Sequence, residues 1–144
     1  MMSQVDGSTS EKELTILYAE DDPYNRDVLV KVARRLPGRV RVVTAKTGTE
    51  ALSLAASESP DLVLLDLDLP DMKGKVLLER LRSGVITDDV PAIVISAHYC
   101  ASTIATMRKA GVREFVSKPF DVGAVLAILT SALDESRNRV EVAR

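Results

Sequence analysis

The chain has 144 residues, of which 46% are apolar, and this is enough to form the core of a single domain. Its 19 basic and 21 acidic residues leave a formal net charge of -2, which provides no basic field for direct binding to nucleic acid or an anionic membrane. The single cysteine, Cys100, excludes an internal disulfide, and no apolar run reaches the roughly 20 residues of a membrane span. Because the N-terminus lacks a signal-peptide pattern, we expect a cytoplasmic protein.

Apolar periodicity divides the chain into alternating strands and helices. Residues 1–12 are polar and lack a hydrophobic period, so we expect a flexible leader there, one domain at 13–136 and a short tail at 137–144. Strands are predicted from short runs of leucine and β-branched residues, and helices from apolar residues at helical spacing. In chain order the predicted elements are strand 14–19, helix 23–36, strand 40–45, helix 48–59, strand 61–66, helix 75–84, strand 91–96, helix 101–111, strand 113–118 and helix 122–137.

Capping residues support these limits. Asp22 before Pro23 is typical of an N-cap followed by a first-turn proline, and Thr47 with Glu50 fits a capping box. Glycines after several of the helical patterns suit C-terminal stops. Repeated alternation of strand and helix predicts an α/β domain, a doubly wound parallel sheet with helices on both faces.

Polar side chains follow the predicted strands at their carboxyl ends. These ends meet at one edge of a parallel sheet, where ligand sites form near the point at which strand order reverses. The four carboxylates of Glu20, Asp21, Asp66 and Asp68, close together, would repel one another, so their presence calls for a cation, and hard oxygen ligands suit Mg²⁺. The residues at these ends are Glu20, Asp21 and Asp22; Asp66 and Asp68; Ser96, Ala97 and His98; and Ser117, Lys118 and Pro119.

The same residue types fit phosphoryl transfer to a carboxylate. A carboxylate is a nucleophile toward phosphorus when the charge on the phosphoryl oxygens is neutralised. Asp66 is the candidate nucleophile, with Mg²⁺ at one phosphoryl oxygen, the Lys118 ammonium at a second and the Ser96 hydroxyl donating to the third. The sequence therefore predicts that Asp66 becomes an acyl phosphate.

Four segments in this order and spacing resemble the receiver domain of two-component response regulators, and the resemblance covers the chain from Leu14 to about Ala132. It implies a flavodoxin-like, three-layer fold, with five helices around a five-stranded parallel sheet in the order 2-1-3-4-5. The segments that carry the resemblance are EDDPYNR (20–26), LLDLDLPDMKG (64–74), VISA (94–97) and FVSKPF (115–120).

The resemblance also assigns roles in metal binding and phosphorylation. Glu20 and Asp21 look like the acidic pair, with Asp21 a direct ligand of Mg²⁺ (or of Mn²⁺ as the alternative) and Glu20 acting through water. Asp66 looks like the phosphoacceptor and metal ligand, and the main-chain carbonyl of Asp68 the third protein ligand. Lys118 matches the family's lysine, which is often joined to the following proline by a cis bond.

Switch residues follow from the same resemblance. Ser96 takes the place of the switch hydroxyl, and Phe115 that of the aromatic switch residue, which is commonly tyrosine. A phenylalanine lacks the phenolic hydroxyl, so any hydrogen bond made by that group in relatives is absent here. Phosphorylation is expected to draw Ser96 toward the phosphoryl oxygens, so that Phe115 rotates into the vacated space. Ala97 must be small to leave access to Asp66.

Partners are implied in the same way. A sensor histidine kinase or a histidine phosphotransfer protein would supply the phosphoryl group, and the receiver itself would catalyse its transfer and its later hydrolysis. The output would be a changed surface formed by helix 101–111, strand 113–118 and helix 122–137, read by an effector protein. The chain would act as a monomer or as a phosphorylation-dependent dimer.

Two interpretations of His98, the only histidine, stay open. It is either a surface residue without a role or, together with Asp68, a residue that flanks the phosphoryl group and tunes its lifetime.

Alternative functions are also left open. The run LLDLDLP resembles the nucleophile loop of haloacid-dehalogenase-type phosphatases, but here the acidic pair precedes the nucleophile, whereas in that family it follows the lysine. A degenerate receiver used only for protein binding is the third interpretation, and the intact set of acids, hydroxyl and lysine counts against it. The few residues after Pro119 predict a stand-alone receiver without an output domain, unless the chain is part of a hybrid kinase or a larger regulator.

Overall fold

A five-stranded parallel sheet forms the centre of the domain. The computed structural model describes residues 12–142, and most of the predicted leader, residues 1–11, lies outside this part. The strand order is β2-β1-β3-β4-β5, so the predicted order 2-1-3-4-5 is confirmed. In chain order the elements are β1 (Leu14–Ala19), α2 (Pro23–Ala33), β2 (Val40–Ala45), α3 (Gly48–Glu58), β3 (Leu62–Leu65), α4 (Gly74–Arg82), β4 (Ala92–Ser96), α5 (Ala101–Lys109), β5 (Val112–Ser117) and α6 (Val122–Val142).

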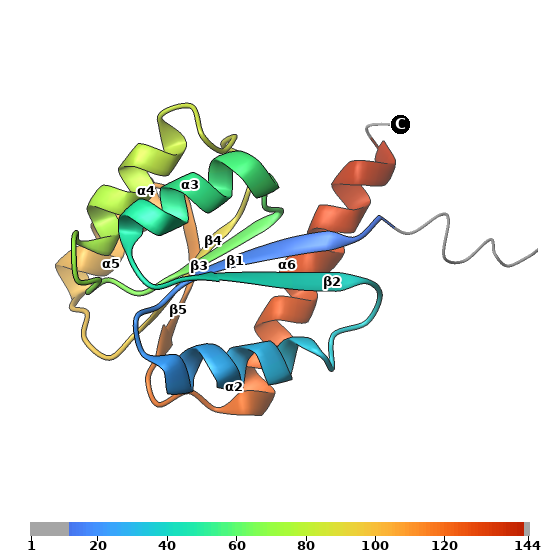
Figure 1. Ribbon diagram of the computed structural model, residues 1–144, viewed down its shortest axis with the longest axis horizontal. Coiled ribbons are helices and arrows are strands. Elements are labelled where there is room, and N and C mark those ends of the chain that lie inside the picture. The colour runs from blue at the N-terminus through green and yellow to red at the C-terminus, as the bar shows by residue number, and fades with distance from the viewer. Residues whose placement is uncertain (1–11, 143–144) are drawn as a thin grey trace, which may run out of the picture.

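Helices cover both faces of the sheet, which gives the predicted three layers. α2 and α6 lie on one face, and α3, α4 and α5 on the other (Figure 1). β1 shows why two faces form: Leu17 and Ala19 pack toward the second group of helices, whereas Leu14, Ile16 and Tyr18 pack toward the first. Because successive side chains of a strand point to opposite faces, a continuous apolar run serves both layers.

Helix boundaries agree with the predicted caps in most places. Asp22 caps α2 by accepting a hydrogen bond from the backbone N–H of Tyr24 at 2.9 Å. The Thr47 hydroxyl accepts from Glu50 N–H at 3.0 Å, but the Glu50 carboxylate accepts from Lys46 N–H, one residue before the cap. In a regular capping box the Glu50 carboxylate would accept from the N–H of the cap residue itself, so this second hydrogen bond is shifted by one residue.

Two predicted helix ends are wrong by three residues or more, and the other helix ends differ from the prediction by one or two residues. α2 stops at Ala33 instead of residue 36, and α6 continues to Val142 instead of ending at Arg137. The polar residues after Ala132 stay helical because polar contacts anchor them: the Ser136 hydroxyl donates to Asp61 O at 3.3 Å, and the Arg137 guanidinium donates to Pro37 O at 3.1 Å. The domain limits at 13 and 136 stay predictions. Within residues 12–142, no helix has the length and apolarity needed to cross a membrane.

The order of the strands fixes where a site forms. The chain passes from β1 to β2 on one side and reaches β3 on the other, so the loops that follow β1 and β3 diverge at the same edge of the sheet. Such a divergence opens a crevice beyond the carboxyl ends of the strands. The carboxyl ends of β4 and β5 extend the same edge, which brings together residues from segments far apart in sequence.

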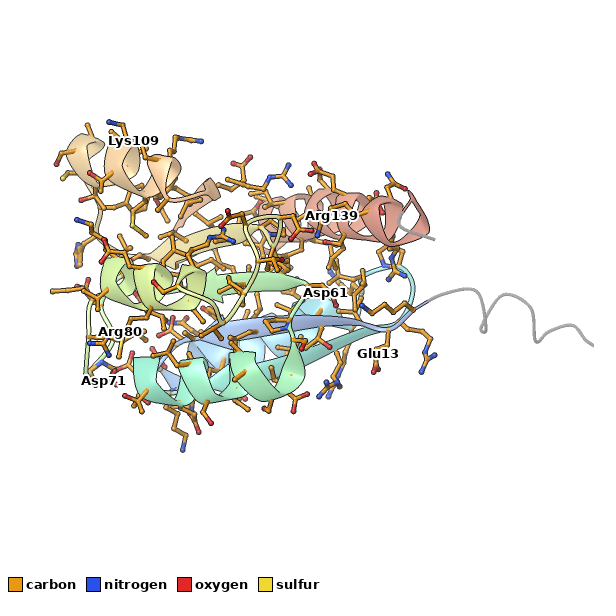
Figure 2. The ribbon with its side chains drawn as sticks, turned by 90° about the horizontal axis from the view of Figure 1, so that it is seen from above. Glu13, Asp61, Asp71, Arg80, Lys109 and Arg139 are labelled. Atoms are coloured by element: carbon orange, nitrogen blue, oxygen red, sulfur yellow. The ribbon has the colours of Figure 1, made fainter. Side chains whose placement is uncertain are left out.

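Asp71 joins this edge to α3. Its carboxylate accepts hydrogen bonds from Gly48 N–H at 2.8 Å, from Thr49 N–H at 3.0 Å and from the Thr49 hydroxyl at 2.7 Å. Figure 2 shows Asp71 at one end of the molecule, well separated from Asp61 and Arg139. The loop after β3 is thereby attached to the N-terminus of α3, where a negative charge is favourable.

We predict that the Asp71 cap stabilises the fold in a pH-dependent way. The hydrogen bonds from Gly48 and Thr49 lower the pKa of Asp71 from 3.8 to about 2. Because the folded state has the lower pKa, the stabilisation is present above pH 4 and is lost as the pH falls toward 2. Asp71→Asn should therefore melt a few degrees below wild type at pH 6, and this gap should close between pH 4 and pH 2.5. Thermal unfolding followed by circular dichroism measures it.

Asp134→Asn is the matched control, since Asp134 is an exposed acid within α6. Its melting temperature should equal that of wild type both at pH 6 and at pH 2.5. A gap between Asp71→Asn and wild type that stays constant with pH would contradict the assigned role of the charge.

Candidate functional site

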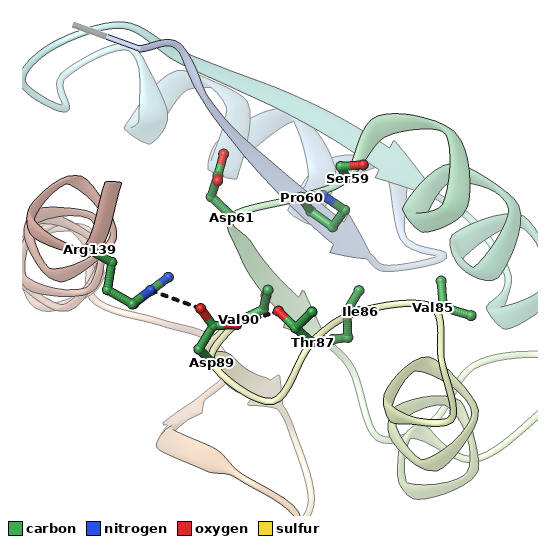
Figure 3. A pocket seen from close by; sticks show the side chains of 9 residues that line it. All are labelled: Ser59, Pro60, Asp61, Val85, Ile86, Thr87, Asp89, Val90 and Arg139. Atoms are coloured by element: carbon green, nitrogen blue, oxygen red, sulfur yellow. Dashed lines mark hydrogen bonds and ion pairs between the residues drawn. The ribbon is translucent and has the colours of Figure 1, made fainter. Parts of the chain in front are cut away.

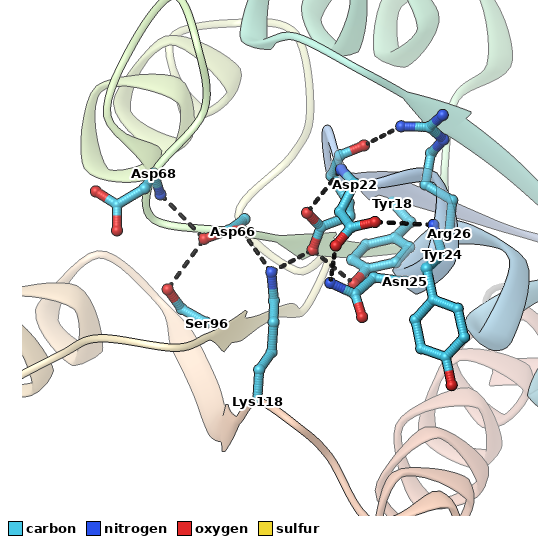
Figure 4. A network of polar contacts seen from close by, with 10 residues as sticks. Tyr18, Asp22, Tyr24, Asn25, Arg26, Asp66, Asp68, Ser96 and Lys118 are labelled. Carbon is cyan, nitrogen blue, oxygen red and sulfur yellow. Dashed lines mark hydrogen bonds and ion pairs between the residues drawn. The ribbon is translucent and has the colours of Figure 1, made fainter.

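Asp66 lies at the centre of the site, directly after β3, and only 6% of it is exposed. Its backbone N–H donates to Ala19 O at 3.1 Å, which holds it beside the end of β1. Its Oδ1 accepts from the Ser96 hydroxyl and from Asp68 N–H, both at 3.0 Å, and its Oδ2 accepts from Lys118 Nζ at 2.6 Å (Figure 4). The three residues predicted to carry phosphoryl transfer are thus in direct contact.

Lys118 follows β5 and points inward, with 13% of its side chain exposed. Its backbone N–H donates to Ser96 O at 3.1 Å, and its bond to Pro119 is cis, as the resemblance implied. The ammonium forms ion pairs with both Glu20 and Asp66. Burial alone would lower the pKa of Lys118, but the hydrogen bonds to the two carboxylates outweigh this and raise it. The lysine is therefore a fixed cation between β1 and β3.

Glu20 is the most buried acid of the site, with 1% exposed. Its backbone N–H donates to Ala45 O at 2.8 Å, and its backbone carbonyl accepts from the Arg26 guanidinium at 2.9 Å. Its carboxylate accepts from the Tyr18 hydroxyl and from Asp22 N–H, both at 3.1 Å. Burial raises the pKa of Glu20, and burial together with the Glu20 charge raises the pKa of Tyr18, so the phenol stays a donor.

The carboxylates of Glu20, Asp21 and Asp66 form one acidic group, in which one oxygen of each lies within 4.8 Å of the others. Asp21 is the exposed member. Among the described residues, the Lys118 ammonium is the cation paired with this group, through Glu20 and Asp66, so negative charge is in excess, and all the donors are hard oxygens. This donor set fits a divalent cation such as Mg²⁺.

The expectation of four clustered carboxylates is wrong for Asp68. Its side chain is 51% exposed and turns to Lys73, whose Nζ lies 3.0 Å from Asp68 Oδ1. Lys73 reaches it because the loop folds back into an antiparallel bridge between these two residues. A role for the Asp68 main-chain carbonyl stays a prediction.

Ala97 and His98 lie exposed in the loop after β4. His98 and Asp68 line the same hollow of about 410 Å³, between the loop after β3 and α5. The small side chain at position 97 and the shared hollow are compatible with the predicted roles of these residues, which stay predictions.

Phe115 on β5 lies partly buried against α5 and the loop before it. Its ring centroid is 5.5 Å from that of Tyr99, and the Arg108 guanidinium lies 5.3 Å above its ring. The Tyr99 hydroxyl is 2.9 Å from the Ser117 hydroxyl. The aromatic pair therefore connects the loop after β4 with β5. Because β4 ends at Ser96, the pair also links this end of the strand to the outer surface near α5.

Sequence reasoning missed three residues that organise the site: Tyr18, Asp71 and Tyr99. For Tyr18 a signal existed, since residues two apart in a strand share a face, which places its ring on the side of Glu20. Asp71 and Tyr99 act through contacts with segments distant in sequence. Their neighbours in the sequence indicate only a polar loop for Asp71 and the start of a helix for Tyr99.

A separate hollow of about 360 Å³ lies at the opposite ends of the strands, beside the segments that lead into β3 and β4 (Figure 3). It contains the ion pair between Arg139 Nε and Asp89 Oδ2 at 3.4 Å, which ties α6 to the loop before β4. Its lining is formed by Ser59, Pro60, Asp61, Val85, Ile86, Thr87, Asp89, Val90 and Arg139.

Comparison with known proteins agrees with the geometry. The model of the response regulator receiver domain matches residues 16–130. The transcriptional regulatory protein KdpE of Mycobacterium tuberculosis is 41% identical over 102 residues, which are 71% of this chain and 44% of KdpE. The probable C4-dicarboxylate response regulator DctR of Bacillus subtilis is 35% identical over 109 residues, 76% of this chain and 47% of DctR. The chain spans about half the length of these relatives.

Solved structures are similar over nearly their whole length. The non-phosphorylated HemR receiver domain from Leptospira biflexa is 30% identical with a TM-score of 0.70, and the match covers 86% of this chain and 94% of that one. A CheY-like receiver domain protein from Methanospirillum hungatei has a TM-score of 0.80 at 24% identity, with 89% and 99% covered, and supports the fold alone.

The excess of negative charge predicts that a divalent cation stabilises the fold. Mg²⁺ that binds only the folded chain should raise the melting temperature of wild type by a few degrees at millimolar concentration. Asp21→Asn removes one member of the acidic group and should reduce this rise by at least half. Differential scanning calorimetry with and without Mg²⁺ measures both.

Asp27→Asn, which removes an exposed acid from α2, is the control and should keep the wild-type rise. An equal rise in Asp21→Asn and Asp27→Asn would show that the cation acts on general surface charge instead.

Proposed function

This chain belongs to the family of response regulator receiver domains of two-component systems, and we propose that Asp66 accepts a phosphoryl group from phosphohistidine. The donor is a sensor histidine kinase or a histidine phosphotransfer protein. The observation that supports this best is the direct contact of Asp66 with both Ser96 and Lys118 beside an acidic group. A carboxylate held by donors on each oxygen is oriented for attack.

Asp66, Lys118 and Ser96 have separate roles in the phosphoryl transfer. An oxygen of Asp66 forms the new bond to phosphorus as the bond from phosphorus to the donor's imidazole nitrogen breaks, and that nitrogen keeps the electron pair. Lys118 neutralises charge on the phosphoryl oxygens, and the Ser96 hydroxyl turns from Asp66 Oδ1 to donate to one of them. Burial of the site strengthens both interactions.

Asp21 and Asp66 would hold a Mg²⁺ ion, with the main-chain carbonyl of Asp68 as a further ligand and Glu20 acting through water. Mn²⁺ offers the same kind of site. When bound, the ion supplies positive charge for the phosphoryl oxygens, which the single ammonium of Lys118 does not balance alone.

Phosphorylation then changes an outer surface. Movement of Ser96 toward the phosphoryl group vacates the space behind it, and Phe115 rotates inward, away from Tyr99 and Arg108. The surface formed by α5, β5 and α6 changes and is read by an effector protein. Intrinsic hydrolysis of the acyl phosphate resets it.

The stand-alone arrangement, the monomeric or dimeric state and the cytoplasmic location stay predictions, as do the kinase and the effector. The relatives KdpE and DctR are longer than this chain, so their activities are not transferred to it.

Incubation with a radiolabelled small phosphodonor and Mg²⁺ tests the proposed function. Wild type should gain at most one phosphoryl group per chain, and Asp66→Asn none. Lys118→Met should be phosphorylated about 100-fold more slowly, because the phosphoryl charge loses its ammonium. A panel of histidine kinases then identifies the natural donor.

Asp88→Asn, an exposed acid in the loop before β4, is the control and should be labelled like wild type. Full labelling of Asp66→Asn would refute the assignment. Continuous release of phosphate from phosphate esters, over many turnovers, would instead favour a haloacid-dehalogenase-type phosphatase.

The lifetime of the phosphoryl group tests the proposed modulators. His98 and Asp68 line one hollow beside the site, so replacing both with alanine should alter the access of water to the acyl phosphate. We expect the dephosphorylation rate of the double variant to differ from wild type by several-fold. Loss of label after removal of the donor measures it, and an unchanged rate would dispose of the role.

A further inference from the structure

Tyr18 places a hydroxyl group deep in the core, next to the site. Its side chain is fully buried in the apolar layer between the sheet and the helices α2 and α6. Its same-face neighbours on β1, Leu14 and Ile16, are apolar, and a phenylalanine would fill the same space. A buried phenol needs a hydrogen-bond partner, and the Tyr18 hydroxyl finds it in Glu20 Oε1 at 3.1 Å.

Glu20 depends on few donors. Its Oε1 receives the Tyr18 hydroxyl and the Lys118 ammonium, and its Oε2 receives Asp22 N–H at 3.1 Å. With 1% of the residue exposed, water does not readily replace a lost donor. The Lys118 ammonium is shared with Asp66, whose Oδ2 lies 2.6 Å from it (Figure 4). An ammonium that turns to a group bonded to Asp66 therefore leaves Glu20 with one donor fewer.

We propose that Tyr18 is a positioning residue of the receiver site, which holds the Glu20 carboxylate in place while Lys118 turns from Glu20 to the phosphoryl group on Asp66. The inference rests on the proposed function, because it needs a phosphoryl group at Asp66. Tyr18 touches none of the reacting atoms and acts through Glu20.

The reason is the cost of leaving a buried carboxylate short of donors. When the ammonium departs, Glu20 Oε1 retains only the hydrogen bond from Tyr18. This bond keeps the carboxylate oriented toward the acidic group that it forms with Asp21 and Asp66. Loss of a hydrogen-bond partner that orients a direct metal ligand typically weakens metal binding about 10–100-fold. Because Glu20 would act on the ion through water, we expect a loss at the lower end of this range.

Tyr18→Phe tests the proposal, because it removes one oxygen and keeps the ring. Isothermal titration calorimetry of the unphosphorylated chain should show Mg²⁺ affinity about 10-fold weaker than wild type. The rate of phosphorylation by a small phosphodonor at saturating Mg²⁺ should also fall, since Lys118 leaves Glu20 less readily. Tyr24→Phe, the same substitution at a tyrosine that is 72% exposed, should leave both quantities unchanged.

The same substitution in a second variant, Glu20→Ala, distinguishes a positioning role of Tyr18 from a role in core packing. In Glu20→Ala, which lacks the acceptor, adding Tyr18→Phe should not weaken Mg²⁺ binding further. Wild-type affinity in Tyr18→Phe, or an equal loss in both backgrounds, would overturn the inference and leave the proposed function intact. Failure of wild type itself to bind Mg²⁺ and to become phosphorylated would refute the proposed function, and the inference with it.

Discussion

One ammonium group between two buried carboxylates holds the site together. Lys118 connects the ends of β1, β3 and β5 through Glu20 and Asp66, neither of which is more than 6% exposed. Two carboxylates this close repel strongly in a buried place, so the arrangement requires the cation. The same requirement would give the site its capacity for change under the proposed function. A phosphoryl group on Asp66 would compete with Glu20 for the ammonium, and the balance among the three groups would set the state of the domain.

The sheet supplies the rigidity that this balance needs. β1 and β3 lie side by side in the centre, and Asp66 N–H is bonded to Ala19 O, so the two acidic ends keep a fixed separation. Side-chain contacts then attach the loops at this edge of the sheet. Asp71 joins the loop after β3 to α3, and Tyr99 joins the loop after β4 to Phe115 and Ser117. A continuous set of contacts therefore runs from Asp66 through Ser96 and β4 to Tyr99 and β5, and the proposed phosphorylation would act on the α5 and β5 surface along it.

Much of this arrangement could be predicted from the sequence, for a physical reason. Parallel strands end at a common edge, so Glu20, Asp66, Ser96 and Lys118 were expected to converge once the strands were recognised, and the strand order is confirmed. What could not be predicted depends on side chains meeting across the fold. Asp68 was expected among the clustered acids, yet Lys73 folds back and takes its carboxylate outward. In the sequence, Tyr18 looks like one more apolar residue of the strand, and only the structure shows that its hydroxyl donates a hydrogen bond to Glu20.

We propose that this set of contacts makes Asp66, and no other carboxylate, the phosphoryl acceptor. Borohydride reduces an acyl phosphate to an alcohol and so converts a phosphorylated aspartate into homoserine. After phosphorylation, reduction and proteolysis, mass spectrometry of the peptides identifies the residue that carried the group. We expect homoserine at position 66 alone. Homoserine at Asp21 or Asp68, or a phosphorylated chain with an unmodified Asp66, would contradict it.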